Sequence, residues 1–159
     1  MIGDNLNVEM LVIAITLIVM GILLYIVDTN SRSDTKYEKM TFKQSMLIGL
    51  SQALAAALPG VSRSGITMTV ARWLGIDRES AARYSFLLGA PIIAAAVIVD
   101  ITKFNFGIPF FVGVISSFLV GIAVIKFLMD YLKKGSFKVF AIYRIIIGLI
   151  VIGIFFTRI

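Results

Sequence analysis

A short polar stretch, residues 59–65 (PGVSRSG), interrupts an apolar sequence and carries the side chains best suited to chemistry. Its Arg63 stays protonated and can bond two phosphate oxygens at once, because the guanidinium group is a planar fork. Ser62 and Ser64 place a hydroxyl on each side of that arginine. A helix beginning just after the break would direct unpaired N–H groups and the positive end of its dipole to the same place. The pattern predicts an anion-binding loop, and phosphate fits it best.

Further candidate binding residues lie in and beside this loop. Gly60 and Gly65 allow backbone conformations that other residues resist, so they can shape the loop around a ligand. Thr67 lies one helical turn beyond Ser64 and either faces the same pocket or bonds back to its own helix, as hydroxyls in membrane helices commonly do. Gln52 lies on an alanine-lined face and either points into the pocket or forms an interhelical hydrogen bond. We predict that five residues bind the substrate: Gln52, Gly60, Ser64, Gly65 and Thr67.

The composition predicts a membrane protein. Of the 159 residues, 59% are hydrophobic and 15% are charged, whereas a soluble domain is about half apolar and a quarter charged. We therefore expect an all-α, polytopic integral membrane protein whose residues 1–159 form a single domain. The net charge of +6 is typical of basic cytoplasmic loops, and no motif indicates a nucleic-acid partner.

Four apolar segments are long enough to cross a bilayer. They predict transmembrane helices over residues 10–27, 81–101, 108–129 and 140–157. Asp28 is expected to end the first of these helices, and a polar loop follows it to Lys43. Pro91 predicts a kink in the second, and a basic loop over residues 130–138 joins the last two.

The segment that contains the anion-binding loop, residues 41–75, is too short to cross the membrane twice. A helix is predicted to begin after Thr41, with Gln44 placed three residues later as in a capping box, and to end at Leu58. The helix after the loop has about 11 residues, or roughly 16 Å. Because neither limb spans a bilayer, the segment predicts a re-entrant helix–loop–helix hairpin.

The distribution of basic residues supports this hairpin. If the chain enters and leaves the hairpin on one side, only Lys103 and Arg158 lie on the opposite side of the membrane. Eight basic residues of the loops and helix ends share the other side: Arg32, Lys36, Lys39, Lys43, Arg78, Lys133, Lys134 and Lys138. The positive-inside rule makes that side cytoplasmic and predicts a multi-pass protein of the plasma or inner membrane.

Five further residues lie near the predicted membrane boundaries and are not expected at the site. Arg72, Arg78 and Arg83 are predicted to snorkel to the interface or to lie in loops. Tyr143 and Arg144 begin the last apolar segment and are predicted to be interface anchors.

The sequence lacks the groups that usually transfer protons or bind catalytic metals. It has no cysteine and no histidine, which excludes thiol nucleophiles, serine–histidine triads and histidine metal ligands. Between Lys43 and Asp77 there is also no acidic residue. The phosphate-binding groups are therefore present without a general acid or base. We assign no metal ligands and no cofactor, and a divalent cation remains open.

Two stretches resemble the undecaprenyl-diphosphatase family, which is also called the bacitracin-resistance protein family. Residues 49–76 contain Pro-Gly-x-Ser-Arg-Ser-Gly with Thr67 two positions on, and residues 79–91 contain Ser-Phe-Leu-Leu and a proline. Residues 141–144 (AIYR) also look like that family's last helix. The resemblance extends from Val8 to the end of the chain.

The resemblance implies an architecture of two inverted repeats, each with a re-entrant hairpin, around one catalytic centre. This chain looks like the C-terminal repeat. It implies that Arg63 and Ser62 are catalytic and bind diphosphate, with Ser64 and Thr67 in support. The acids and the histidine expected from the other repeat are absent here, and by internal symmetry the first acid falls at Gln52.

Two functions follow as hypotheses. The first is an undecaprenyl-diphosphate phosphatase, or its C-terminal half, which releases phosphate from the lipid for carrier-lipid recycling in cell-wall synthesis and is associated with bacitracin resistance. Its partners would be the membrane, a polyprenyl diphosphate, and either a second copy or a separate N-terminal half. The second is a non-enzymatic lipid-phosphate binding or transporter subunit. A plain membrane scaffold leaves Arg63 unexplained.

Overall fold

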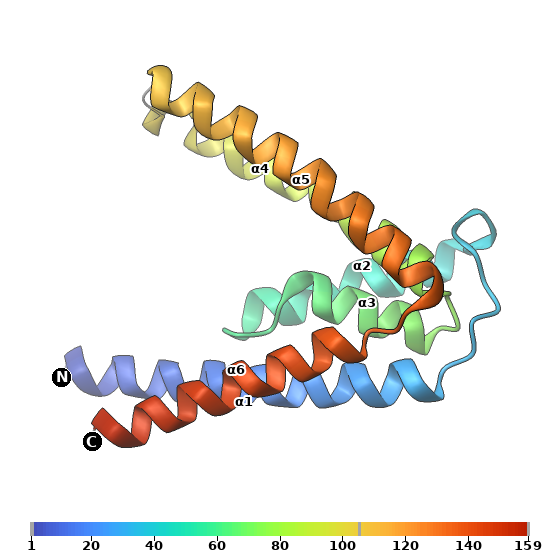
Figure 1. The fold of residues 1–159 in the computed structure, drawn as a ribbon, viewed down its shortest axis with the longest axis horizontal. Helices are drawn as coiled ribbons and strands as arrows, with labels where there is room; N and C mark the ends of the chain where they lie inside the picture. Colours follow the sequence, from blue (N-terminus) through green and yellow to red (C-terminus); the bar gives the residue numbers. More distant parts are fainter. Residues whose placement is uncertain (1, 105, 159) are drawn as a thin grey trace.

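The computed structural model describes residues 2–104 and 106–158, which form six α-helices (Figure 1). They are α1 (Ile2–Asn30), α2 (Phe42–Ala57), α3 (Arg63–Trp73), α4 (Arg78–Asp100), α5 (Ile108–Lys134) and α6 (Lys138–Arg158). Short 3-10 helices cover Tyr37–Lys39 and Ile101–Lys103. The only β-pairing in this part of the chain is a single bridge between Thr35 and Ile76. The all-α prediction is confirmed.

Four helices within the described residues are long and apolar enough to cross a membrane. They are Val8–Asn30, Arg78–Asp100, Ile108–Lys134 and Lys138–Thr157. These helices correspond to the four predicted spans and confirm a multi-pass membrane protein.

Two predicted helix ends are wrong. Helix α1 continues past Asp28 to Asn30, because the Asp28 carboxylate is paired inside the protein and not solvated in a loop. Helix α5 continues through much of the predicted basic loop to Lys134. There Lys133 Nζ donates to Asp130 Oδ1 at 2.8 Å, one turn away, and lysines near a helix C-terminus interact favourably with its dipole.

The segment predicted as a hairpin forms two short, antiparallel helices that lie side by side (Figure 1). The predicted capping box is confirmed, since Gln44 N donates to Thr41 Oγ1 and Thr41 N donates to Gln44 Oε1. Helix α2 has 16 residues and α3 has 11, or about 24 Å and 16 Å at the α-helical rise. Both are shorter than the hydrocarbon core of about 30 Å.

The turn between α2 and α3 packs against the middle of α1. Thr16 Oγ1 donates to Pro59 O at 2.8 Å. Gly60 has a φ of +85° and lies so close to Ile13 and Thr16 that a Cβ atom would overlap both. Only glycine fits here, because any other residue would be strained at this positive φ and its Cβ would overlap α1. The hairpin therefore reaches about halfway along α1.

The helices are arranged around α3. Helices α1 and α6 run side by side along most of their length, while α4 and α5 form a second pair that diverges from them (Figure 1). Helix α3 contacts both α1 and α4. The connections α1–α2, α3–α4 and α5–α6 lie at one end of the molecule, and both termini lie at the other (Figure 1). This arrangement agrees with the predicted sharing of one side by the basic loops.

A buried ionic network joins four parts of the chain at the base of the hairpin. Asp28 Oδ1 accepts from Arg72 Nε at 2.9 Å and from Arg78 Nε at 2.8 Å. Its Oδ2 accepts from Phe137 N at 3.0 Å, in the connection between α5 and α6. Further acceptors of the Arg72 guanidinium are the carbonyl oxygens of Asp28, Ser31, Arg32 and Ile76 and the hydroxyl of Ser33.

The predicted snorkelling of Arg72 and Arg78 is therefore wrong. Arg72 is 0% exposed, and it is tolerated there because every guanidinium nitrogen donates a hydrogen bond. Arg78 is half-buried against the same carboxylate. Arg83 is exposed, and its guanidinium lies 4.9 Å from the centre of the Tyr37 ring.

Candidate functional site

The first turn of α3 gathers the polar side chains that were predicted to bind an anion. Ser62 is the N-cap residue, and its Oγ accepts from Gly65 N at 3.3 Å. The hydroxyl oxygens of Ser62 and Ser64 lie 3.2 Å apart. An α-helix begins with N–H groups that have no acceptor inside the helix. Two hydroxyls and the positive end of the α3 dipole thus lie together.

Arg63, the first residue of α3, extends toward α4. Its guanidinium lies directly against Gly89, so that a Cβ atom at that position would overlap it. Its Nη1 atom is buried and has no hydrogen-bond partner among the described residues. A buried charged donor left without a partner costs about 1–3 kcal/mol or more. An anionic ligand would remove that cost.

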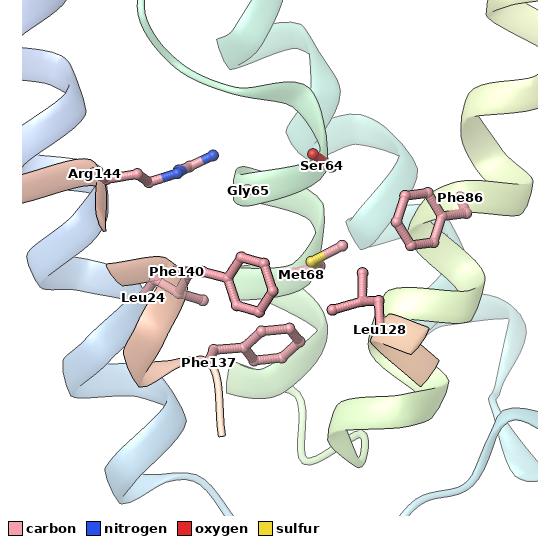
Figure 2. Close-up of a pocket in the computed structure, with 9 residues that line it drawn as sticks. All are labelled: Leu24, Ser64, Gly65, Met68, Phe86, Leu128, Phe137, Phe140 and Arg144. Carbon is pink, nitrogen blue, oxygen red and sulfur yellow. The ribbon is translucent and has the colours of Figure 1, made fainter. Parts of the chain in front are cut away.

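Arg144 brings a second guanidinium to the same turn from α6. Figure 2 shows its side chain reaching toward α3 beside Ser64 and Gly65. The contact with Gly65 is so close that a Cβ atom there would overlap the guanidinium. Its Nη1 is also buried, and no partner for it lies in the described part of the chain. The prediction that Arg144 is an interface anchor is wrong, whereas Tyr143 beside it is exposed.

Thr67 does not open toward a ligand. It is 1% exposed, and its Oγ1 lies within hydrogen-bond distance of Arg63 O and Ser64 O in its own helix. The same oxygen lies 2.7 Å from Ser85 Oγ of α4. Of the two predicted alternatives, bonding back to the helix is observed. Thr67 holds α3 against α4 one turn below Arg63.

Gln52 and Gly60 lie outside the first turn of α3. Gln52 Nε2 donates to Gly49 O of its own helix at 3.5 Å. Its Oε1 is buried and lacks a partner within residues 2–104 and 106–158, so the described structure contains no interhelical hydrogen bond from this oxygen. Gly60 shapes the turn against α1 as described above. The structure thus brings together Ser62, Arg63, Ser64 and Gly65.

A small cavity of about 140 Å³ lies beside this turn (Figure 2). Its polar end is formed by Ser64, Gly65 and Arg144. The remaining walls are apolar: Leu24, Met68, Phe86, Leu128, Phe137 and Phe140. A cavity with one polar end and apolar walls suits an amphiphilic ligand. Its charged group would lie at Arg144 and its hydrocarbon against the aromatic rings.

The site is cationic and suited to bind an anion, but its described residues include no carboxylate or imidazole for proton transfer. The chain has no histidine. No group of three or more His, Cys, Asp or Glu side chains lies together in the part of the chain that the structure describes. Its chemistry is therefore recognition of phosphate oxygens and stabilisation of the negative charge on them.

Three residues that form this site were not predicted from the sequence. Arg144 carried a signal, because a charge inside a long apolar segment is costly and commonly functional. Gly89 and Ser85 lie in the stretch that carries the family resemblance, but their residue types gave no further signal, since small residues are ordinary in membrane helices. They lie four residues apart on α4, and therefore on one face of it, against Arg63 and Thr67 of α3.

Comparison with known proteins places these features in a family. The family described as "Bacitracin resistance protein BacA" matches residues 1–150. The chain is 50% identical over 145 residues to an undecaprenyl-diphosphatase of Pelotomaculum thermopropionicum, covering 89% of this chain and 54% of that protein. It is 40% identical over 151 residues to an undecaprenyl-diphosphatase of Moorella thermoacetica, covering 93% and 58%. The chain thus spans somewhat more than half the length of these relatives.

Proposed function

We propose, given that the chain belongs to the bacitracin resistance protein BacA family, that it binds the diphosphate group of undecaprenyl diphosphate and takes part in its hydrolysis. The relatives are named undecaprenyl-diphosphatase. The products would be undecaprenyl phosphate and inorganic phosphate. The protein would act in the plasma or inner membrane, where that lipid is recycled for cell-wall synthesis.

One observation carries this proposal: two arginines from different helices present buried, unpaired donors at the first turn of α3. The Nη1 atoms of Arg63 and Arg144 have no acceptor among the described residues. A diphosphate offers several charged oxygens, and guanidinium groups bind such oxygens through strong, short hydrogen bonds. The Ser62 and Ser64 hydroxyls add donors at the same turn.

In the proposed reaction, water attacks the terminal phosphorus, the bridging P–O bond breaks, and the lipid monophosphate departs. Negative charge spreads over the phosphoryl oxygens and the bridging oxygen as that bond breaks. Arg63 would stabilise this charge from a fixed position, because its guanidinium is held against Gly89. Ser62 serves better as a ligand than as a nucleophile, since the described residues of the site include no carboxylate or imidazole that could act as a general base and take its proton.

The proton-transfer groups must come from another segment. Neither histidine nor an acid lies between Lys43 and Asp77. We propose that a separate N-terminal repeat supplies them across the exposed faces of the helices, or that a second copy of this chain, which has no histidine, supplies carboxylates alone. We also propose that the α2–α3 hairpin is re-entrant from the cytoplasmic side. Its two short helices and the basic loops at its base support this topology.

A non-enzymatic lipid-phosphate binding or transporter subunit is the second candidate function. The observation in its favour is that anion-binding groups occur without a general acid or base. Helix termini that point at an anionic substrate from a broken helix are also a feature of transporters.

The test is phosphate release from undecaprenyl diphosphate by membranes that contain the full chain, compared with Arg63→Ala. We expect release to fall at least about a hundredfold in that variant, as for the loss of one transition-state donor. Arg83→Ala is the matched control, because Arg83 is exposed and lies outside the site; it should leave release unchanged.

Binding and release together separate the candidate functions. Arg63-dependent binding without release would mean that this chain is either one repeat of the enzyme or a binding subunit. Release after the N-terminal repeat of a relative is added would favour the enzyme, and continued absence of release would favour the binding or transporter subunit. Release by the parent chain that Arg63→Ala leaves unchanged would refute the proposed function.

A further inference from the structure

The cavity beside Arg144 adjoins a groove at the surface of the chain. Its wall residues Leu128 of α5 and Phe140 of α6 also line a neighbouring groove of about 320 Å³ between these two helices. The other residues of that groove are Val124, Phe127, Tyr131 and Val139. These side chains are aliphatic or aromatic, and Val124, Phe127 and Val139 are well exposed on the outer surface. Leu128 and Phe140 therefore lie between the polar site and an apolar groove at the surface of the chain.

A second groove also begins near the cavity, with which it shares Phe86. It lies between α4 and α5 and is partly lined by the charged residues Glu79 and Arg83. Burying charged groups under hydrocarbon is costly. The groove between α5 and α6 has no such groups in its lining, so it is the better path for a hydrocarbon chain.

We infer that the prenyl chain of the bound lipid leaves the site between α5 and α6, past Leu128 and Phe140. This inference rests on the proposed function, because it assumes that the diphosphate lies at Arg63 and Arg144. The polar end of the cavity holds the charged group, the rings of Phe137 and Phe140 contact the first part of the chain, and the groove carries the rest into the bilayer. The cavity itself is too small for more than a short piece of that chain.

The groove would guide the prenyl chain by its shape and would add little to the binding free energy. Lipid tails are as apolar as the groove, so moving the prenyl chain from lipid into it releases little free energy. What the groove supplies is an apolar path from the charged site to the surface, past the shared side chains of Leu128 and Phe140. The inference therefore predicts that an obstruction in this groove matters and that an equal obstruction in the other groove does not.

Two neighbouring residues of α5 offer a matched pair of obstructions. Val124 lines the groove between α5 and α6, and Ile125 lines the groove between α4 and α5. Both side chains are exposed, by 56% and 43%, so a tryptophan at either position should be tolerated by the fold.

The experiment measures binding to the full chain in lipid nanodiscs with two probes. Inorganic diphosphate reports the charged site alone, and farnesyl diphosphate with a diazirine at the end of its chain reports the path. We expect Val124→Trp to weaken farnesyl diphosphate binding at least about tenfold and to leave inorganic diphosphate binding unchanged, with Ile125→Trp affecting neither. Photolabelling of the parent chain should fall on Phe127 and Val139.

Labelling of Leu87 and Ala90, or an effect of Ile125→Trp in place of Val124→Trp, would overturn the inference in favour of the other groove. Equal binding of the farnesyl probe by both tryptophan variants would also overturn it. Inorganic diphosphate binding that does not depend on Arg63 would instead show that the proposed function is wrong, and the inference would fail with it. The first two results leave the proposed function intact.

Discussion

The two ends of helix α3 each carry an arginine, and they use it in opposite ways. At the C-terminal end, Arg72 is 0% exposed and bonds to Asp28 and to surrounding carbonyl groups. At the N-terminal end, Arg63 is partly exposed, and its buried Nη1 has no acceptor in the described structure. The first arrangement satisfies every guanidinium nitrogen, and the second leaves a donor free for a ligand.

The difference lies in what surrounds each guanidinium. Asp28 meets Arg72 and Arg78 where the loops of the molecule converge, so carboxylate and carbonyl acceptors are abundant. The Arg63 guanidinium lies against Gly89, and its Nη1 meets no acceptor among the described residues. A fully paired buried charge holds structure together, whereas an incompletely paired one marks a binding site.

Breaking the paired end should have the largest effect. Asp28→Ala leaves Arg72 buried without its counter-ion, which should lower the free energy of unfolding by about 3–5 kcal/mol. Thermal unfolding in detergent, followed by circular dichroism, measures the loss. Asp130→Ala is the control, because the Asp130–Lys133 pair is exposed; it should cause no measurable change. A normal melting temperature for Asp28→Ala would contradict the structural role given to the network.

Altering Gly89, against which the unpaired Arg63 guanidinium lies, should have an intermediate effect. In Gly89→Ala the new methyl group overlaps the end of the flexible Arg63 side chain, which can move aside. The cost in stability should therefore stay below the roughly 1–3 kcal/mol of overpacking in a rigid core, whereas diphosphate binding should weaken because the guanidinium is displaced. Gly113→Ala, where no neighbouring atom lies within 4 Å, should be neutral or slightly stabilising. Unfolding and diphosphate titrations measure the two quantities. Unchanged diphosphate binding in Gly89→Ala would show that binding by Arg63 does not require its contact with Gly89.

Removing the unpaired charge itself should have the smallest effect on stability. Arg63→Met keeps the length of the side chain but removes a charged group whose Nη1 has no acceptor among the described residues. The free energy of unfolding should therefore stay within about 0.5 kcal/mol of the parent or rise, while Arg63-dependent diphosphate binding is lost. A destabilisation comparable with that of Asp28→Ala would mean that Arg63 is a structural residue, and the comparison between the two ends of α3 would fail.

Features that depend on neighbours in the sequence were predictable. The Thr41 capping box and the grouping of Ser62, Arg63 and Ser64 at a helix start follow from local geometry, and both appear in the structure. The four spans follow from the length of the apolar segments. Helix ends were less predictable, because partners distant in the sequence stabilise them, as they do at Asp28.

The sequence by itself determined the class of protein, the interrupted hairpin and the chemistry of its loop, because side-chain type and helical spacing express hydrophobicity and hydrogen bonding locally. Only the tertiary structure decided which arginines are paired and which are free. Arg72 meets an aspartate 44 residues away, and Arg144 reaches α3 from the last helix. Composition and spacing cannot indicate such meetings, because the fate of a buried charge depends on the acceptors that the packed helices bring to it.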